Sequence, residues 1–172
     1  IHRRLGTSGA LASAVFRYPL NTSWHLVPHG LARDTAGGIY LATTHYWRAG
    51  ELTYSRVVLA RFNLSCVRQW ERYISFGGSH TLAGNVLIGP TNSAVVFVTV
   101  ASKTTPASEM RALRYTNAGG FMYNYRFGRP LPAVDACVDV AQAGTSAYVA
   151  GTGRANTATS DHNITLYRLI NL

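Results

Sequence analysis

"AVVFVTVAS", residues 94 to 102, is apolar at every position but one from Ala94 to Val100. Its valines and phenylalanine favour a β-strand, and the run is far shorter than the ~20 apolar residues that a membrane-spanning helix needs. Because successive side chains of a strand point to opposite faces, a run without polar alternation predicts a sheet that is covered on both faces. This stretch therefore predicts stacked sheets.

The rest of the chain has the same character. No long window keeps apolar residues at helical spacing, whereas Val, Ile, Thr, Tyr and Phe gather in short runs that Gly, Asn, Ser and Pro interrupt. The pattern predicts an all-β fold. The runs include "GIYLATT", "RVVLARF", "EMRALRY", "FMYNYRF", "ACVDVA", "SAYVAGT" and "NITLYRL".

Length and composition favour one domain with a real core, since the chain has 172 residues of which 47% are hydrophobic. The formal charge of +9 comes almost wholly from arginine, because Lys103 is the only lysine among 16 basic residues. Such a charge suits an acidic partner, but the arginines are dispersed, which argues against a nucleic-acid groove. The opening residues, "IHRR", contain no initiator Met, so we expect a piece of something longer.

An arginine recurs in one setting four times, in "AVFRYPLN", "VLARFNLS", "RALRYTNA" and "TLYRLINL". These are Arg17, Arg61, Arg114 and Arg168, at intervals of 44, 53 and 54 residues. About fifteen residues before each lies a strand that ends in small or hydroxylated residues, such as "LATT" or "VAGTG". The period fits a unit of four short antiparallel strands, A to D. The chain then reads BCD-ABCD-ABCD-ABC, with a partial unit at 1–28, full units at 29–76 and 77–127, and a partial unit at 128–172.

These units resemble the blades of bacterial propeller-repeat proteins of the seven-bladed kind and, more loosely, NHL-type blades. The resemblance spans nearly the whole chain and is carried by "SAYVAGTG" with "ITLYRLIN" and by "GGIYLATT" with "VVLARFN". The WD dipeptide and the sialidase box S-x-D-x-G-x-T-W are missing. The resemblance implies β-propeller blades of four antiparallel strands, about three and a half of them, which are too few for the usual ring. We expect the remaining blades in the same polypeptide; another chain or a small irregular ring are the alternatives.

The recurring arginine is expected to be structural. A hairpin between strands C and D places Arg61 opposite Trp70, Arg114 opposite Tyr123 and Arg17 opposite Trp24. Each guanidinium would then lie on an aromatic face, a contact worth about 0.5–1 kcal/mol when exposed. Alternatively, the arginine lies at a strand edge and reaches water over a buried stem.

The two cysteines, Cys66 and Cys137, have no metal-binding spacing. The lettering places them on different blades, one at an outer turn and one on an innermost strand, so two free thiols are expected. Glycosylation sequons begin at Asn21, Asn63 and Asn163, which favours an extracellular or cell-surface protein.

No catalytic, cofactor or metal site is expected, because the seven acidic residues are spread along the chain. Asp135 and Asp139 fall near an innermost strand and could bind a cation, although satisfying turn amides or arginines is the favoured interpretation. His25 and His29 lie four apart, but on a strand that meets Pro28, so a zinc site is not expected there.

The cluster His45, Tyr46, Trp47 and Arg48 is placed in the loop between strands B and C of the first full blade. Exposed there, it would suit a protein interface or glycan stacking; alternatively, Trp47 folds back over the blade edge. The leading hypothesis is a non-enzymatic structural or protein-interaction propeller module without a membrane span. The competing hypotheses are a glycan-binding propeller, an enzyme with a site in the channel, and an arginine-rich subunit of a large organellar assembly.

Overall fold

The computed structural model describes residues 2–5, 10–13, 24–128, 134–154 and 163–170, and it confirms the all-β fold class. Within these residues the only helical element is a three-residue 3₁₀ turn, η1 (Pro90–Asn92). The strands are β1 (His2–Leu5), β2 (Ala10–Ser13), β3 (Trp24–Arg33), β4 (Ile39–Ala49), β5 (Leu52–Phe62), β6 (Arg68–Ile74), β7 (Ser79–Ile88), β8 (Ala94–Ser102), β9 (Ser108–Tyr115), β10 (Phe121–Phe127), β11 (Val134–Ala143), β12 (Ser146–Arg154) and β13 (Asn163–Ile170).

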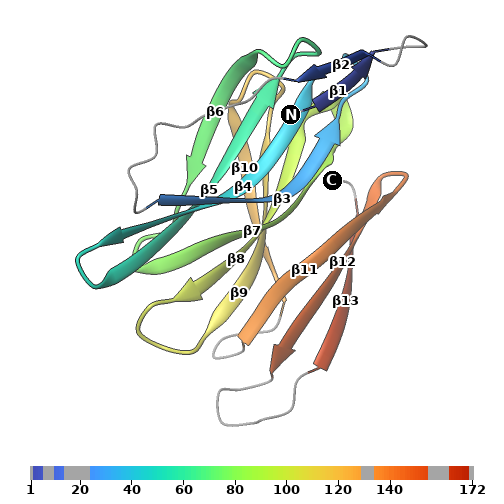
Figure 1. The fold of residues 1–172 in the computed structure, drawn as a ribbon. Coiled ribbons are helices and arrows are strands. Elements are labelled where there is room, and N and C mark those ends of the chain that lie inside the picture. The colour runs from blue at the N-terminus through green and yellow to red at the C-terminus, as the bar shows by residue number, and fades with distance from the viewer. Residues whose placement is uncertain (1, 6–9, 14–23, 129–133, 155–162, 171–172) are drawn as a thin grey trace.

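Three antiparallel sheets follow one another along the chain (Figure 1). The first unit comprises β3 to β6, the second β7 to β10 and the third β11 to β13, and within each unit every strand pairs with the next. A single parallel bridge between Val134 and Ser108 joins the third unit to the second. Strands β1 and β2 pair with each other. The described sheets therefore form about three blade-like units that do not close into a ring.

Each unit opens with a strand that carries a β-bulge at the same place. The register shifts lie between Pro28 and Gly30 in β3, between Ala83 and Asn85 in β7, and between Cys137 and Asp139 in β11. A bulge bends its strand and increases the local twist. The units thus share the position of the bulge as well as the order of their strands.

Glycine permits the close approach of these first strands. A Cβ on Gly30 would lie 2.4 Å from Asn85 Oδ1, and a Cβ on Gly84 would lie 2.7 Å from Cys137 Sγ. A Cβ on Gly30 would also lie 2.7 Å from the backbone nitrogen of Val86, so this position requires glycine, whereas at Gly84 the Cys137 side chain would have to shift. The sequence signals are the glycines of "PHGLA" and "LAGNV".

Residues 24 to 28 differ from the expected arrangement. Instead of ending a preceding unit, they continue into β3, which pairs with β4 along its length and places Trp24 opposite Trp47. Pro28 is tolerated because it lies beside the bulge, where the ladder is already irregular. Arg17 and Asn21, to which the sequence assigns a structural and a glycosylation role, lie outside the described residues.

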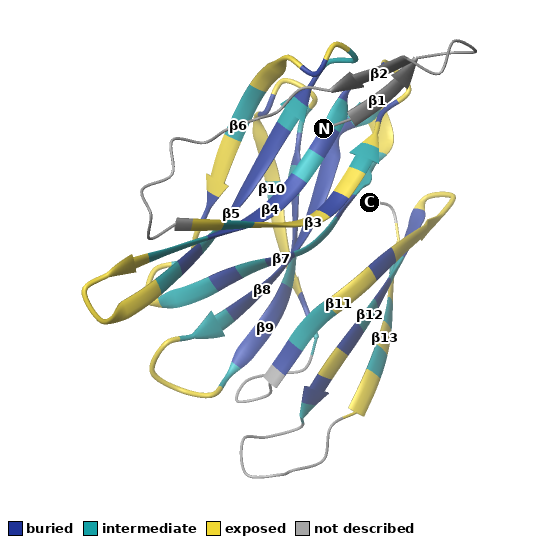
Figure 2. Cartoon of the chain, viewed as in Figure 1, coloured by how far each residue is buried: buried dark blue, intermediate teal, exposed yellow. Residues whose placement is uncertain are grey.

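Strand β8 is buried over most of its length (Figure 2). Its alternate side chains enter different cores, as the opening stretch of sequence predicts. The core shared with the first unit includes Ala94, Val96, Val98 and Val100, and the core shared with the third unit includes Val95 and Phe97. All of these side chains are buried. The second unit is therefore covered on both faces.

Three five-residue turns are built alike, at 34–38, 63–67 and 116–120. In each, the side-chain oxygen of the first residue accepts a hydrogen bond from the backbone N–H of the fifth: Asp34 at 2.6 Å, Asn63 at 3.0 Å and Thr116 at 2.9 Å. The fourth residue is left-handed, namely Gly37, Cys66 and Gly119. An Asp, Asn or Thr followed three residues later by Gly thus predicts this kind of turn, and Cys66 replaces the glycine in one of the three.

Both cysteines are free thiols, as the strand lettering predicts. Cys66 is buried in its turn, and Cys137 lies on β11. Burial, with a smaller contribution from Asp139, raises the pKa of Cys137 to about 12. The Cys137 thiol therefore stays protonated near neutral pH and is a poor nucleophile.

Candidate interaction surfaces

The recurring arginine of each third strand contacts the turn between the first and second strands of its own unit. Arg61 Nη2 lies 3.2 Å from Asp34 Oδ2, and the Asp34 side chain is fully buried. Arg114 donates to Ser93 Oγ at 2.7 Å and to the Pro90 carbonyl at 2.9 Å. We call these contacts the arginine bridges. They explain why the residue recurs, since a guanidinium has several donors with which to join a strand to a turn.

The bridge of the third unit is weaker. Arg168 Nε and Nη2 each lie 3.4 Å from Ser146 Oγ, and no carboxylate of the described residues pairs with this guanidinium. The guanidinium also lies 5.9 Å from the Tyr148 ring. The three arginines therefore hold equivalent positions, but their contacts weaken along the chain, from an ion pair at Arg61 to hydrogen bonds at Arg114 and longer hydrogen bonds at Arg168.

Register places Arg61 opposite Trp70 and Arg114 opposite Tyr123. The Arg114 guanidinium lies 5.8 Å from the Tyr123 ring centroid, within cation–π range. Arg61 instead lies 5.6 Å from the Tyr40 ring, and Trp70 meets Tyr40 edge-on at 5.9 Å. The expected stacking of Arg61 on Trp70 is thus replaced by stacking on Tyr40, because the ion pair with Asp34 draws the guanidinium toward the first turn.

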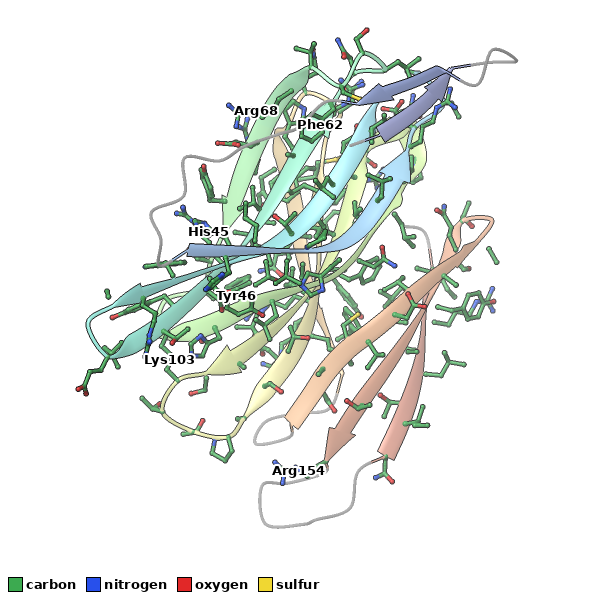
Figure 3. The ribbon with its side chains drawn as sticks, in the orientation of Figure 1. His45, Tyr46, Phe62, Arg68, Lys103 and Arg154 are labelled. Atoms are coloured by element: carbon green, nitrogen blue, oxygen red, sulfur yellow. The ribbon has the colours of Figure 1, made fainter. Side chains whose placement is uncertain are left out.

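The cluster His45 to Arg48 lies within strand β4 and not in a loop, because β4 and β5 extend together to a tight turn at Gly50 and Glu51. His45 is buried, Tyr46 and Trp47 are half-buried, and Arg48 is exposed. The hairpin of β4 and β5 projects at the end of the sheet where Tyr46 and Lys103 lie, opposite the end that carries Phe62 and Arg68 (Figure 3). Of the four residues, only Arg48 is fully at the surface.

Cations and aromatic rings alternate beside this hairpin. Arg56 lies 4.1 Å from the Tyr73 ring and 5.2 Å from the Trp47 ring. Trp47 stacks on Tyr54 at 5.5 Å, and Lys103 Nζ lies 4.1 Å from the Tyr54 ring. We call these five residues the hairpin cluster. Its rings and cations already contact one another, so the cluster stiffens the hairpin.

His45 adjoins the hairpin cluster. Its Nδ1 accepts a hydrogen bond from Arg56 Nε at 3.2 Å. Burial and, to a smaller extent, the Arg56 charge lower the pKa of His45. The imidazole is therefore neutral at physiological pH.

The predicted sequons have different surroundings. Asn63 is half-buried, and its Oδ1 accepts from the N–H groups of Ser65 and Val67 within its turn. Asn163 is exposed at the start of β13. Asn163 is thus the more accessible of the two described sequons.

The aspartates near the first strand of the third unit do not converge. Asp135 is buried opposite Gly153, whereas Asp139 is exposed opposite Ala150, on the other face of the sheet. Asp139 Oδ1 accepts from the N–H of Val140 at 2.8 Å and from Asn85 Nδ2 at 3.2 Å. Asp139 therefore satisfies a backbone amide beside the bulge and an asparagine side chain, and not a turn amide or an arginine. In the described part of the chain no three His, Cys, Asp or Glu side chains gather as metal ligands.

One face of the third unit is open. Ile164 and Leu166 are 87% and 72% exposed. Register with Arg168 makes them equivalent to Val57 and Leu59 in the first unit and to Met110 and Ala112 in the second, all of which are buried against the following unit. The surface of Ile164, Leu166, Tyr148, Ala150 and Thr152, which we call the open face, therefore carries side chains at positions that are core elsewhere.

A threonine hydroxyl links successive units, and sequence reasoning missed this role. Thr44 Oγ1 accepts from the backbone N–H of Ala83 at 2.9 Å, and Thr99 Oγ1 accepts from that of Cys137 at 3.0 Å. Both N–H groups lie at the bulge of the next unit's first strand. The signal was the threonine in "LATT", "VTVAS" and "VAGTG".

The third member of this series is Thr152, on the open face. Its side chain is exposed to solvent. Register places it where Thr44 and Thr99 lie in the preceding units. The open face thus carries both the apolar surface and the polar acceptor of an inter-unit contact.

Comparison with known proteins gives no family. No protein-family model matches the chain, and a search of curated proteins finds no match. Among the described residues, no helix has the length and apolar character to cross a membrane.

Proposed function

We propose that this chain is a non-enzymatic structural and protein-interaction module of propeller type, which packs its open face against a further antiparallel sheet. The observation that carries the proposal is the threonine series. Thr44 and Thr99 each bind the bulge N–H of a following unit, and Thr152 presents the same hydroxyl to solvent. Because Thr44 and Thr99 each accept from a bulge N–H of the next sheet, the group that fits Thr152 is a backbone N–H of the same kind.

The apolar surface supports the same partner. Ile164 and Leu166 lie at positions that are buried in both preceding units. Burying apolar surface contributes about 25 cal/mol per Å², and exposed contiguous apolar patches commonly mark interaction sites. The open face therefore has the composition of an interface.

The partner is an antiparallel sheet of the same repeat. The second and third units each turn a bulged first strand toward the unit before them, and the donating N–H belongs to Ala83 in one and to Cys137 in the other. Their second strands place small apolar side chains on the same face. A sheet with these features would give Thr152 its donor and cover Leu166. A further blade built like the second and third units would supply both features.

The arginine-rich composition supports a structural role. Many of the described arginines are engaged within the chain, in ion pairs, hydrogen bonds to carbonyls or contacts with rings; they are Arg56, Arg61, Arg68, Arg72, Arg111, Arg114, Arg126 and Arg168. Guanidinium groups used in this way are not free to track a polyanion. This weighs against an arginine-rich subunit that binds nucleic acid in an organellar assembly.

The alternative of a glycan-binding propeller would use Trp47. Its ring is already in contact with Tyr54 and Arg56, which leaves less of it for sugar stacking. Loss of binding on a glycan array by Trp47→Ala would favour this alternative. An extracellular or cell-surface location rests on the sequons alone, and a mass shift on enzymatic deglycosylation at Asn163 would support it.

Sedimentation velocity of the native chain over a range of concentrations tests the proposed function. We expect self-association, because the open face is exposed, and we expect Leu166→Glu to suppress it. Leu52→Glu is the matched control, since Leu52 is 63% exposed at the tip of the β4–β5 hairpin. A monodisperse monomer, or equal effects of the two substitutions, would count against the proposal.

A further inference from the structure

The geometry points to a proton-sensitive contact between the first and second units, in which protonation of His29 weakens the hydrogen bond that joins Thr44 to the bulge of β7. The contact lies between two units whose four strands are all described, so it does not depend on the open face or on the docking of a further sheet.

Three groups form a chain of hydrogen bonds across this contact. The backbone N–H of Ala83, at the bulge of β7, donates to Thr44 Oγ1 at 2.9 Å, and the same oxygen lies 2.9 Å from His29 Nε2. A hydroxyl has one proton to donate. In the arrangement that satisfies all three groups, Thr44 accepts from Ala83 and donates to Nε2. The imidazole is then neutral and carries its own proton on Nδ1.

Protonation of the imidazole reverses one bond of this chain. Both nitrogens of an imidazolium are donors, so its Nε2–H and the Ala83 N–H would compete for one oxygen, and the Thr44 hydroxyl would lose its acceptor. Thr44 is fully buried, where a polar group without a partner is costly. Acid therefore weakens the contact between the two units at its buried end.

The ring itself can exchange protons with solvent, because the His29 side chain is exposed whereas Thr44 is not. Burial of part of the ring lowers the pKa of His29 below its ordinary value of 6.5. The contact is therefore intact at physiological pH, and the weakening is confined to mildly acidic conditions.

The neighbouring charged groups do not set the protonation of this ring. Strand β3 pairs with β4 and packs against β7. The other titratable side chains of these three strands are His25 and Arg33 on β3, Tyr40, His45, Tyr46 and Arg48 on β4, and His80 on β7. His45 points to the opposite face of β4 from Thr44, Arg48 lies at the exposed end of β4, and His80 Nδ1 lies 3.3 Å from a serine hydroxyl of β5. Burial is the cause of the lowered pKa of His29.

The contact between the second and third units is built alike but has no imidazole beside its threonine. Thr99 Oγ1 accepts from the N–H of Cys137 at 3.0 Å, and Gly84 takes the place of His29 at the bulge of β7. Burial raises the pKa of the Cys137 thiol to about 12, so this side chain does not change its charge in mild acid. The second contact is therefore an internal control for the first.

Hydrogen exchange measured by NMR on the full chain at pH 7.5 and 5.5 tests the proposal. After correction for intrinsic exchange, the protection of the Ala83 amide should fall about threefold or more at the lower pH, and that of Cys137 should change less. His29→Gln keeps a polar side chain that does not titrate, so it should remove the pH dependence at Ala83. His25→Gln is the matched control, because His25 is an exposed imidazole on the same strand, and it should leave that dependence unchanged.

The tautomer of His29 is a second measurement, and it needs no variant. The ¹⁵N chemical shifts of the ring should place the proton on Nδ1 at pH 7.5, and Nε2 should gain a proton as the pH falls. A proton on Nε2 at pH 7.5 would overturn the proposal. Equal losses of protection at Ala83 and Cys137 would indicate a general loss of stability, and a dependence that persists in His29→Gln would assign the titration to another group; each result would also overturn it.

Discussion

Leu59 and Leu166 occupy the same position in two units and meet opposite surroundings. Each lies two residues before the recurring arginine, in "VLARF" and "TLYRL". Leu59 is fully buried between the first and second sheets, whereas Leu166 is 72% exposed on the third. The local sequence therefore specifies a side chain that suits a stacked sheet, and the presence of the following sheet decides whether the side chain is buried.

The sharpest test of this comparison is truncation at both sites. Leu59→Ala should lower the free energy of unfolding by about 2–5 kcal/mol, because it leaves a cavity in a packed core. Leu166→Ala should change it by no more than about 0.5 kcal/mol, because the side chain is already in water. Urea unfolding monitored by circular dichroism measures both. Similar losses at the two sites would show that the open face is covered in the isolated chain.

The arginine bridges give the next largest difference. Arg61→Ala should cost about 2–3 kcal/mol, since it leaves the buried Asp34 carboxylate without its cation. Arg168→Ala removes a contact with a serine hydroxyl at 3.4 Å and should cost about 0.5 kcal/mol.

A double-mutant cycle identifies the partner of Arg61. The coupling of Arg61 with Asp34 should exceed its coupling with Trp70, because the guanidinium contacts the carboxylate and not the indole. A larger coupling with Trp70 would show that Arg61 stacks on the indole, as the sequence predicts.

Much of the fold could be predicted from the sequence, because strand propensity and the recurring arginine are local signals. The apolar run at 94–102 indicated a sheet buried on both faces, and the period gave the order of strands within each unit. Two predictions differed from the structure: the unit boundary between residues 28 and 29 falls inside β3, and the loop assigned to "HYWR" falls inside β4. In both places strand pairing over the whole length of a hairpin outweighs a local signal.

The inter-unit contacts could not be predicted in the same way. Thr44 and Ala83 lie in different units, and no local pattern shows that a hydroxyl on one strand meets a bulge amide on another. The contact that the Arg61 guanidinium makes depends on Asp34, which is distant in sequence and has no acidic counterpart in the turns of the second and third units. Such side-chain partners follow from how the sheets stack and not from the composition of any one strand.

The threonine series predicts a smaller contrast. Thr44→Val should cost about 1–2 kcal/mol, because it removes the acceptor of the buried Ala83 N–H at an almost unchanged volume. The same substitution at Thr152 should be nearly neutral in the isolated chain, since its hydroxyl faces water. If a further sheet is supplied, Thr152→Val should weaken its binding. Equal stabilities of Thr44→Val and the native chain would remove the basis for extending the series to Thr152.

The pH dependence of stability should be concentrated in the first unit. Burial lowers the pKa of His29, whose Nε2 lies 2.9 Å from Thr44 Oγ1, and burial together with Arg56 lowers that of His45. In the unfolded chain both imidazoles have a pKa of ~6.5. Each therefore stabilises the fold in its neutral form at higher pH, and this contribution is lost as the pH falls below ~6.5, where the unfolded state binds more protons. Gly84 and Val138 take the place of His29 at the bulges of the second and third units. Urea unfolding at several pH values between 7.5 and 5 should show a decline in stability that His29→Gln and His45→Gln each reduce; an unchanged decline in both variants would place the titrating groups elsewhere.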